Sequence, residues 1–379
     1  MRMLVLGAGL QGSACAYDLL QDPQVTEVRL ADLHVDHLPP FLAPHVGHRL
    51  IPTPLDVRDR EAVASLMRDA VAVMSAIPYY FNEMLAGLAV EAGAHFCDLG
   101  GNTEIVFRQK ELHDQAKAKG ISIVPDCGVA PGMVNILAQH GIEQLDTVDS
   151  VKIYVGGLPQ HPEPPLNYQI VYSLEGVLDY YTTLSWVLRG GARTQVKALS
   201  ELETVSFPAP VGKLEAFHTA GGLSTLAFRY EGKIPTMEYK TLRYPGHAKI
   251  MEAIRDLGLL DLEPIDVKGK KVSPRDVAVA AMTPHLMKKK PDLVALRVTV
   301  AGTSRGRAET RAWELVDRFD EVHGISAMMR TTGYSLAITG LMQARGGIAA
   351  GVHTPDECIP AQQYITELSR RGVDIRAVG

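Results

Sequence analysis

A strand, a glycine turn and a helix follow one another at the start of this sequence, and this order restricts the fold strongly. The apolar run MLVL at 3–6 leads directly into GAGLQG at 7–12, and SACAYDLL at 13–20 follows with the apolar spacing of a helix. Because the glycines have GxGxxG spacing between a strand and a helix, the segment predicts a dinucleotide-binding turn in a parallel sheet.

Strands and helices continue to alternate along the first third of the chain. Apolar strands are predicted at 27–32, 49–57, 70–77, 95–100 and 121–126, with helices at 59–69, 81–92 and 104–118. Such alternation is typical of a parallel sheet covered by helices on both faces. We therefore expect a Rossmann-type doubly wound α/β domain over residues 1–127.

The pattern changes after residue 127, as expected for a chain of 379 residues that exceeds one ordinary core. Longer, more alternating strands are predicted at 151–157, 238–244 and 293–303, and helices at 325–343 and 361–370. We expect an α+β substrate domain with a mainly antiparallel sheet over 128–334. Residues 335–379 are expected to fold back onto the first domain.

Charge and cysteine content exclude several classes of protein. A net charge of −5 and a pI of 6.2 disfavour binding to nucleic acid. No apolar run reaches the roughly 18 residues that span a bilayer, and no secretory signal is evident. Four scattered cysteines are typical of a reducing compartment. We expect a cytoplasmic protein that acts on a small molecule. We also expect a homodimer, only because homodimers are the commonest oligomers of soluble proteins.

A metal site is not expected. His34 and His37, and then His45 and His48, have HxxH spacing, but they lie in a proline-rich loop without cysteine.

The glycines have distinct roles in the predicted turn. Gly7 allows the tight turn, Gly9 lets the backbone approach a pyrophosphate, and Gly12 allows close packing of the helix. The phosphates would meet the unpaired N–H groups of the helix N-terminus, with Leu10 and Gln11 beside them. The alternative is a glycine turn in a domain that binds no nucleotide.

Asp32 ends the second predicted strand, about 20 residues after the glycines, where a carboxylate accepts hydrogen bonds from the adenosine ribose. It would repel a 2′-phosphate, and no Arg or Lys within 33–48 offsets it, so we expect NAD rather than NADP. Other strand ends extend the site. They supply Asp56 and Val57 toward adenine, Ala76, Ile77 and Pro78 toward nicotinamide, and Gly100, Asn102 and Val129 nearby.

Two further motifs end strands at the same predicted rim. CDLGGNT at 97–103 contains Asp98, and PDCGVAPGM at 125–133 contains Cys127. A substrate for hydride transfer must lie at this rim. Asp98 is either a functional carboxylate or a simple cap, and Cys127 either lines the site or is a buried thiol.

Seven segments together resemble the saccharopine dehydrogenase-like family over nearly the whole chain. They are GAGLQG, SAIPYYFN (75–82), CDLGGNT, PDCGVAPGM, GGLPQHPEPPLNY (156–168), KTLRYPGH (240–247) and MMRTTGY (328–334). Within the family, the sequence is similar to members that oxidise L-lysine at C6. The resemblance implies an NAD-dependent oxidation of a carbon that bears an amine, giving the 6-semialdehyde and ammonia.

The resemblance also suggests roles for the second half of the chain. Arg243 would hold the substrate carboxylate through its planar guanidinium, and His247 would accept the proton of the amine. Asp98 and Tyr244 are the next candidates for the catalytic base. Cys127, Thr241 and Arg330 are the other predicted substrate contacts.

Alternatives remain at each level. Arg243 and Tyr244 point to opposite faces of a strand, and His247 could simply cap the following helix. The reaction could instead be that of a saccharopine dehydrogenase or a carboxyspermidine-type secondary-amine dehydrogenase, for which Arg193, Arg229 or Arg330 could bind a further carboxylate. A third possibility is an NAD-binding sensor without catalysis.

Overall fold

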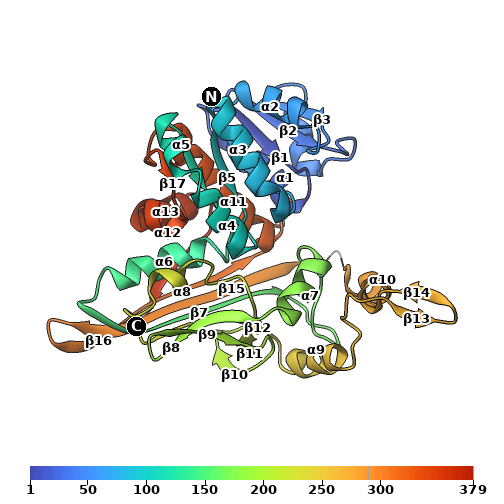
Figure 1. The fold of residues 1–379 in the computed structure, drawn as a ribbon, viewed down its shortest axis with the longest axis vertical. Helices are drawn as coiled ribbons and strands as arrows, with labels where there is room; N and C mark the ends of the chain where they lie inside the picture. The colour runs from blue at the N-terminus through green and yellow to red at the C-terminus, as the bar shows by residue number, and fades with distance from the viewer. Residues whose placement is uncertain (289, 379) are drawn as a thin grey trace. The chain divides into compact units, whose positions relative to one another are not determined.

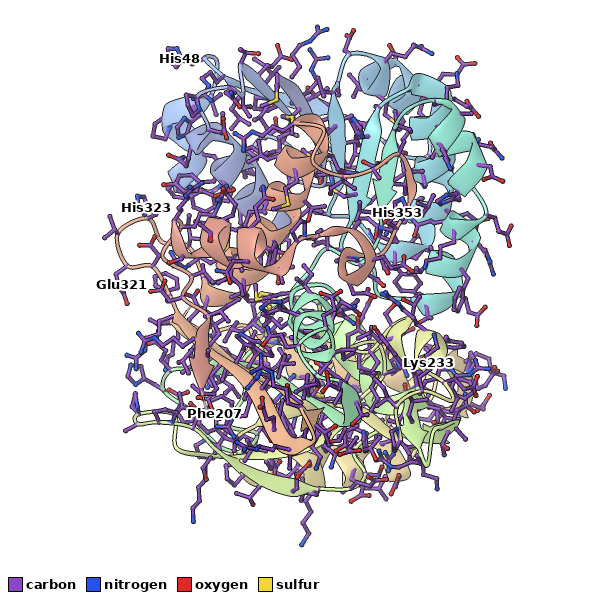
Figure 2. All side chains as sticks on the ribbon, turned by 90° about the vertical axis from the view of Figure 1, so that its left-hand side faces the viewer. His48, Phe207, Lys233, Glu321, His323 and His353 are labelled. Carbon is purple, nitrogen blue, oxygen red and sulfur yellow. The ribbon has the colours of Figure 1, made fainter. Side chains whose placement is uncertain are left out.

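The computed structural model describes residues 1–288 and 290–378, which form two compact units (Figure 1). Unit 1 consists of Met1–Glu143 and Asp320–Ile375. Unit 2 consists of Gln144–Phe319 and the end of the chain from Arg376. Figure 2 shows the side chains, with His48 and His323 on loops of unit 1.

Unit 1 is built on a seven-stranded sheet in which every pair is parallel, in the order β17-β6-β5-β4-β1-β2-β3. The strands are β1 (Arg2–Leu6), β2 (Glu27–Asp32), β3 (Leu50–Pro54), β4 (Ala72–Ser75), β5 (His95–Asp98), β6 (Ser122–Val124) and β17 (Gly351–Val352). This confirms the predicted Rossmann-type sheet. The strand order reverses between β1 and β4, which is where such sheets bind ligands.

The helices of unit 1 come from both ends of the chain. They are α1 (Leu10–Gln21), α2 (Arg60–Arg68), α3 (Asn82–Ala92), α4 (Thr103–Lys110), α5 (His113–Ala118), α6 (Met133–Ile142), α11 (Ala327–Ala344), α12 (Pro355–Cys358) and α13 (Ala361–Ser369), with 3₁₀ turns η1 (Pro40–His45) and η2 (Tyr79–Phe81). The single helix predicted over 104–118 is therefore two helices, α4 and α5.

Helix α11 is the central helix of unit 1. All of its residues from Ala327 to Gln343 are buried except Arg330. It packs along α1 and against β4 and β5. Two glycines permit this, because a Cβ at Gly333 would lie 2.7 Å from the Gln11 carbonyl oxygen and one at Gly340 would lie 2.5 Å from the Met74 sulfur.

Unit 2 is built on a larger mixed sheet with the order β10-β11-β12-β7-β15-β16-β18, to which β8 and β9 are added beside β12. The strands are β7 (Thr147–Pro159), β8 (Ser185–Arg189), β9 (Ala192–Val196), β10 (Glu203–Ser206), β11 (Lys213–His218), β12 (Thr236–Arg243), β15 (Asp292–Ser304), β16 (Arg307–Arg318) and β18 (Arg376–Val378). The β12–β7 pair is parallel and the other pairs are antiparallel. The predicted, mainly antiparallel α+β domain is confirmed.

Four helices and a small hairpin complete unit 2. They are α7 (Leu174–Thr182), α8 (Leu226–Arg229), α9 (His247–Asp256), α10 (Pro274–Leu286) and the hairpin of β13 (Ile265–Val267) with β14 (Lys270–Val272). One apolar core cluster joins α7, α9 and α10 through side chains that include Tyr181 and Phe217. None of the helices in the described ranges has the length and apolar character needed to cross a bilayer.

The boundary between the units lies after α6, whereas the sequence pattern placed it at residue 127. Helix α6 packs against α12 and α13, which belong to unit 1. The second boundary lies at Asp320, before α11, rather than at residue 335.

Two glycine substitutions should have opposite effects on stability. Gly333→Ala places a Cβ 2.7 Å from backbone and side-chain atoms of α1, so we expect a loss of about 1–3 kcal/mol in the free energy of unfolding. Gly87→Ala in α3 meets no atom within 4 Å, so the helix propensity of alanine should add up to about 1 kcal/mol. Urea denaturation of both variants tests this, and equal effects would contradict the close α1–α11 packing.

Candidate functional site

The glycine turn of unit 1 has the geometry of a phosphate-binding loop. Gly7 has a φ of +100°, and a Cβ at Gly12 would lie 1.8 Å from the Gly7 carbonyl oxygen. At Gly9, by contrast, a Cβ would meet no atom within 4 Å. Glycine is therefore required for the turn at Gly7 and for packing at Gly12, while the space beside Gly9 is open to a ligand.

Helix α1 begins directly after this turn. Its N-cap is Gly9, which offers no side-chain hydrogen bond, and its first turn has no acidic residue. Leu10 at the start of α1 is half exposed, so the first N–H groups of the helix are accessible. Free N–H groups and the helix dipole favour an anion at this position.

Asp32 lies beside the same turn. One carboxylate oxygen accepts a hydrogen bond from the Ala8 N–H at 2.7 Å, and the other accepts one from the His34 N–H at 3.1 Å. The carboxylate therefore fixes the loop at the end of β2. It also places a negative charge next to the start of the glycine turn.

The other predicted cofactor residues all follow strand ends in unit 1. Asp56 and Val57 follow β3, Ala76, Ile77 and Pro78 follow β4, Gly100 and Asn102 follow β5, and Val129 follows β6. Because the strands are parallel, these positions lie at the same edge of the sheet as the glycine turn.

Several of these side chains also have local structural roles. The Asn102 amide oxygen caps α4 by accepting from the Glu104 and Ile105 N–H groups. Asp56 forms an ion pair of 2.6 Å with Arg58, whose hydrogen bonds lower the Asp56 pKa to about 2. Gln11 has a buried side-chain oxygen for which no hydrogen-bond partner is found in the described residues.

Asp98 and Cys127 are both enclosed in unit 1. The Asp98 carboxylate accepts hydrogen bonds from Gly100 N–H and the Gln109 amide, each at 2.7 Å, and a longer one from Asp126 N–H. Burial raises the Asp98 pKa to about 6 although these donors oppose the shift. The Cys127 thiol lies 3.1 Å from the Val124 carbonyl oxygen, and burial raises its pKa well above the ordinary value.

In unit 2, Arg243 and His247 are connected through Tyr181. Arg243 Nε donates to the Tyr181 hydroxyl at 3.2 Å, and this hydroxyl lies 2.9 Å from His247 Nε2. His247 Nδ1 lies 3.1 Å from the Leu166 carbonyl oxygen, which can only accept. The histidine proton therefore resides on Nδ1, and Nε2 accepts from Tyr181.

The cluster of Arg243, Tyr181 and His247 is buried, and this determines its charge. Burial, with a further contribution from Arg243, lowers the His247 pKa to about 3, so the imidazole is neutral at physiological pH. The Arg243 guanidinium is 3% exposed and lies 4.7 Å from the centre of the Tyr168 ring. No carboxylate of the described residues forms an ion pair with it.

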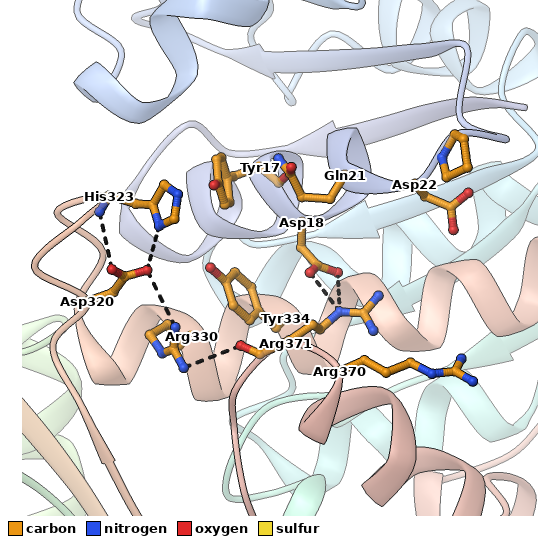
Figure 3. A pocket seen from close by; sticks show the side chains of 11 residues that line it. Tyr17, Asp18, Gln21, Asp22, Asp320, His323, Arg330, Tyr334, Arg370 and Arg371 are labelled. Atoms are coloured by element: carbon orange, nitrogen blue, oxygen red, sulfur yellow. Dashed lines mark hydrogen bonds and ion pairs between the residues drawn. The ribbon is translucent and has the colours of Figure 1, made fainter.

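The remaining predicted residues have other hydrogen-bond or ion-pair partners. The Thr241 hydroxyl is paired with that of Thr219 at 2.7 Å, and the Tyr244 hydroxyl donates to the Pro159 carbonyl oxygen at 3.1 Å. Arg330 belongs to unit 1, where it lies on α11 beside Asp320 (Figure 3). The structure thus connects Arg243 and His247 through one hydroxyl, and Thr241 and Tyr244 form their own separate hydrogen bonds.

Sequence reasoning missed Tyr181 of the buried cluster and Tyr168, whose ring lies beside Arg243. Tyr168 ends the segment GGLPQHPEPPLNY that contributed to the family resemblance, so a signal was present. Tyr181 is one tyrosine within an amphipathic helix, and its position opposite Arg243 depends on tertiary packing.

A second charged cluster in unit 2 has the donors of a metal site. Ligand atoms of Glu201, His218 and Glu238 all lie within 4.8 Å of one another. However, Arg189 Nη2 already lies 2.8 Å from Glu201, 2.7 Å from Glu238 and 3.4 Å from His218. A guanidinium thus occupies the position that a cation would take, and we assign no metal here.

The neutral state of His247 predicts a pH dependence of stability. Between about pH 3 and 6.5 the unfolded chain binds one proton more at this residue than the folded chain, so stability falls as the pH decreases. His247→Gln should remove up to about 1.4 kcal/mol per pH unit of this slope in urea denaturation between pH 6.5 and 4.5. Replacement of the exposed His48 by Gln is the control, and three equal slopes would refute the assignment.

Two solved structures have the same fold. The apo saccharopine dehydrogenase (L-Glu forming) of Saccharomyces cerevisiae aligns with a TM-score of 0.81 and 21% identity, covering 100% of both chains. The homospermidine synthase of Legionella pneumophila in complex with NAD aligns with a TM-score of 0.71 and 12% identity, covering 100% of this chain and 91% of the other. At these identities, the likeness supports the fold alone.

Curated relatives are similar over part of their length. The mouse mitochondrial alpha-aminoadipic semialdehyde synthase is 26% identical over 274 residues, which is 69% of this chain and 29% of the relative. The saccharopine dehydrogenase [NADP(+), L-glutamate-forming] of Saccharomyces cerevisiae is 25% identical over 228 residues, 58% of this chain. The chain spans half the length of this yeast relative.

Two family models together match almost the whole chain. Residues 3–124 match the saccharopine dehydrogenase NADP binding domain, and residues 128–373 match the saccharopine dehydrogenase C-terminal domain. The phosphate-binding turn lies in the first match, and the buried Arg243 cluster lies in the second. The chain therefore belongs to the saccharopine dehydrogenase family of oxidoreductases with an NAD(P)-binding domain.

Proposed function

We propose that the chain is an NAD-dependent dehydrogenase that oxidises L-lysine at C6, giving the 6-semialdehyde and ammonia. The observation that carries this proposal is the buried guanidinium of Arg243, which has no carboxylate partner among the described residues. Glu215, which pairs with Arg243 in the β11–β12 register, accepts instead from the Gly246 and Ala248 N–H groups. A buried guanidinium without an ion pair is a candidate anion-binding site.

Another buried arginine of unit 2 makes the contrast clear. Arg275 is 7% exposed and forms an ion pair with Asp179. Around Arg243 there are instead the phenol rings of Tyr168 and Tyr181. The Tyr168 hydroxyl is also buried and lacks a hydrogen-bond partner in the described part of the chain. Arg243 donates to the Tyr181 hydroxyl and to the Leu242 carbonyl oxygen, and a guanidinium has five N–H donors. Its other donors, together with the Tyr168 hydroxyl, are suited to one α-carboxylate of an amino acid.

The chemistry requires a neutral amine on the substrate. A lysine side-chain ammonium has a pKa near ~10.4 and must lose a proton before C6 can lose a hydride. We assign this proton to His247 Nε2 by way of the Tyr181 hydroxyl, which would release its own proton as it accepts one. Burial is the main cause of the low His247 pKa, and a carboxylate bound at Arg243 would offset the smaller contribution of the guanidinium charge.

A nicotinamide cofactor held at the glycine turn and Asp32 would supply the acceptor for the hydride of C6. Loss of that hydride makes C6 an iminium carbon, water adds to it, and ammonia leaves as the aldehyde forms. The chain's part is to hold the α-carboxylate at a fixed distance from the reacting carbon.

We also propose NAD as the preferred cofactor, although the first family model is named for NADP. The carboxylate of Asp32 beside Ala8 would repel a 2′-phosphate and accept from ribose hydroxyls. Arg58 is the basic residue that follows β3, but its guanidinium is paired with Asp56 at 2.6 Å.

Saccharopine oxidation is the second candidate, because curated relatives with that activity in their names match this chain. Saccharopine carries more carboxylates than lysine and would need a further cation. Arg193, one candidate from the sequence, is bound to Glu231 at 2.7 Å and lies over the Phe228 ring. Because Arg193 already has these contacts, we favour lysine, which has a single carboxylate, over saccharopine.

Turnover with a set of amines tests the function. The protein is incubated with NAD and separately with L-lysine, saccharopine, carboxyspermidine and 1,5-diaminopentane, which is lysine without its carboxylate. We expect nicotinamide reduction to be fastest with L-lysine. Reduction with saccharopine instead would establish the second candidate, and tight NAD binding without any reduction would indicate a sensor.

Arg243→Lys then tests the carboxylate contact. A lysine keeps the charge but not the bidentate geometry, so we expect kcat/KM for L-lysine to fall by roughly 10–100-fold. The kcat/KM for 1,5-diaminopentane should change little, because this amine has no carboxylate to lose. Equal losses with both amines would show that Arg243 acts on the structure rather than on the substrate.

Asp32→Asn separates charge from hydrogen bonding at the cofactor site. The amide oxygen can still accept from the Ala8 N–H, but it does not repel a phosphate. We expect the ratio of kcat/KM for NAD to that for NADP to exceed 10 in the unmodified protein, and to fall by about tenfold in the variant. A preference of the unmodified protein for NADP would refute the assignment.

A further inference from the structure

Unit 1 contains a second pocket, distinct from the phosphate-binding turn. It has a volume of about 370 Å³ and lies beside the last two turns of α1, the loop at 320–323, the start of α11 and the end of α13 (Figure 3). Tyr17 and Asp18 of this pocket are seven and eight residues beyond the start of α1, which corresponds to roughly 10–12 Å along the helix.

Opposite charges face the pocket from different elements. Asp18 and Asp22 come from α1 and its C-cap, whereas Arg370 and Arg371 follow α13 and Arg330 belongs to α11. With Asp320 included, three carboxylates and three guanidinium groups line the pocket. Because carboxylates and guanidinium groups line the pocket in equal number, a ligand that carries both charges fits better than a simple anion or cation.

Each carboxylate of the pocket has a basic partner, since Asp22 pairs with Arg345 and Asp320 with Arg330. The Asp18 side chain is 4% exposed, and both of its oxygens accept from the same donor, Arg371 Nε, at 2.7 and 2.8 Å. Burial outweighs this arginine and raises the Asp18 pKa to about 6. A carboxylate has further lone pairs, so an added ammonium could bind here.

A hydroxyl also points toward this space. Tyr334 is 4% exposed and its hydroxyl is directed into the pocket (Figure 3), and within the described ranges no protein group forms a hydrogen bond with it. The hydroxyl is therefore available to a ligand in the pocket. The rings of Tyr17 and His323, 5.5 Å apart, form an aromatic wall nearby. Aromatic faces and carboxylates are typical surroundings of an ammonium.

The basic side of the pocket has an accessible guanidinium. The Arg370 side chain is 69% exposed, and one of its N–H groups donates to Glu367 at 2.6 Å. A guanidinium has five N–H donors, so Arg370 can still bind a carboxylate in bidentate geometry.

We propose that this pocket binds a zwitterionic α-amino acid as an effector, with its ammonium at Asp18 and Tyr334 and its carboxylate at Arg370. The site is separate from Arg243, and it does not depend on the proposed reaction. Helix α1 carries both this pocket and the phosphate-binding turn, and any coupling of amino-acid binding to cofactor binding through it must be equal in both directions.

Isothermal titration of the full chain tests the proposal. In the Arg243→Lys background, which weakens the proposed substrate site, we expect L-lysine and L-glutamate to bind with one equivalent per chain. Butylamine and butyrate each carry one of the two charges and should bind at least tenfold more weakly. Absence of saturable binding by both amino acids, or equal binding by either single-charge probe, would overturn the proposal.

Variants of the pocket provide the second measurement. Tyr334→Phe keeps the ring and removes the hydroxyl, and Arg370→Glu reverses an exposed charge, so each should weaken amino-acid binding at least tenfold. Arg305→Glu, in the turn between β15 and β16, is the matched control and should have no effect. Turnover by the pocket variants should be retained at saturating cofactor. Unchanged binding in both pocket variants would refute the site even if the proposed reaction is confirmed.

Discussion

The architecture of unit 1 depends on the packing of one buried helix from the end of the chain. Helix α11 is enclosed on all sides, which is possible because its residues are mainly apolar or small. Gly333 brings it against the α1 backbone, and Gln343 donates to the carbonyl oxygens of Phe96 and Ser122 at 2.9 Å. Residues far apart in the sequence therefore complete one face of the cofactor sheet. The fixed position of α1 in turn determines where its N-terminal N–H groups point.

The candidate sites of unit 1 and unit 2 attract an anion in different ways. In unit 1, backbone N–H groups and the close approach allowed by glycine provide an anion site without a formal charge. In unit 2, Arg243 provides a full charge that is retained in the interior by phenol groups. The first device suits a cofactor whose phosphates must be bound and released, while the second suits recognition of one planar carboxylate.

Local patterns were enough to predict the features that depend on local chemistry. The strand, turn and helix around Gly7 and the parallel sheet were predicted correctly because their signals lie in short segments. The break between α4 and α5 was missed because both halves have the same helical pattern. The position of α6 in unit 1 was missed because it follows from packing against α12 and α13. Tyr181, which links Arg243 to His247, precedes them by 62 and 66 positions in the sequence. No local pattern shows such a contact.

The guanidinium of Arg189 lies among Glu201, His218 and Glu238 where a metal ion would otherwise be bound. Arg189 at the end of β8 binds Glu238 of β12 and Glu201, which precedes β10. It connects these segments as a divalent ion would, but as part of the chain it cannot dissociate or be removed by a chelator. Replacement of Arg189 by a small residue would leave the N and O donors of Glu201, His218 and Glu238 facing one another without a cation.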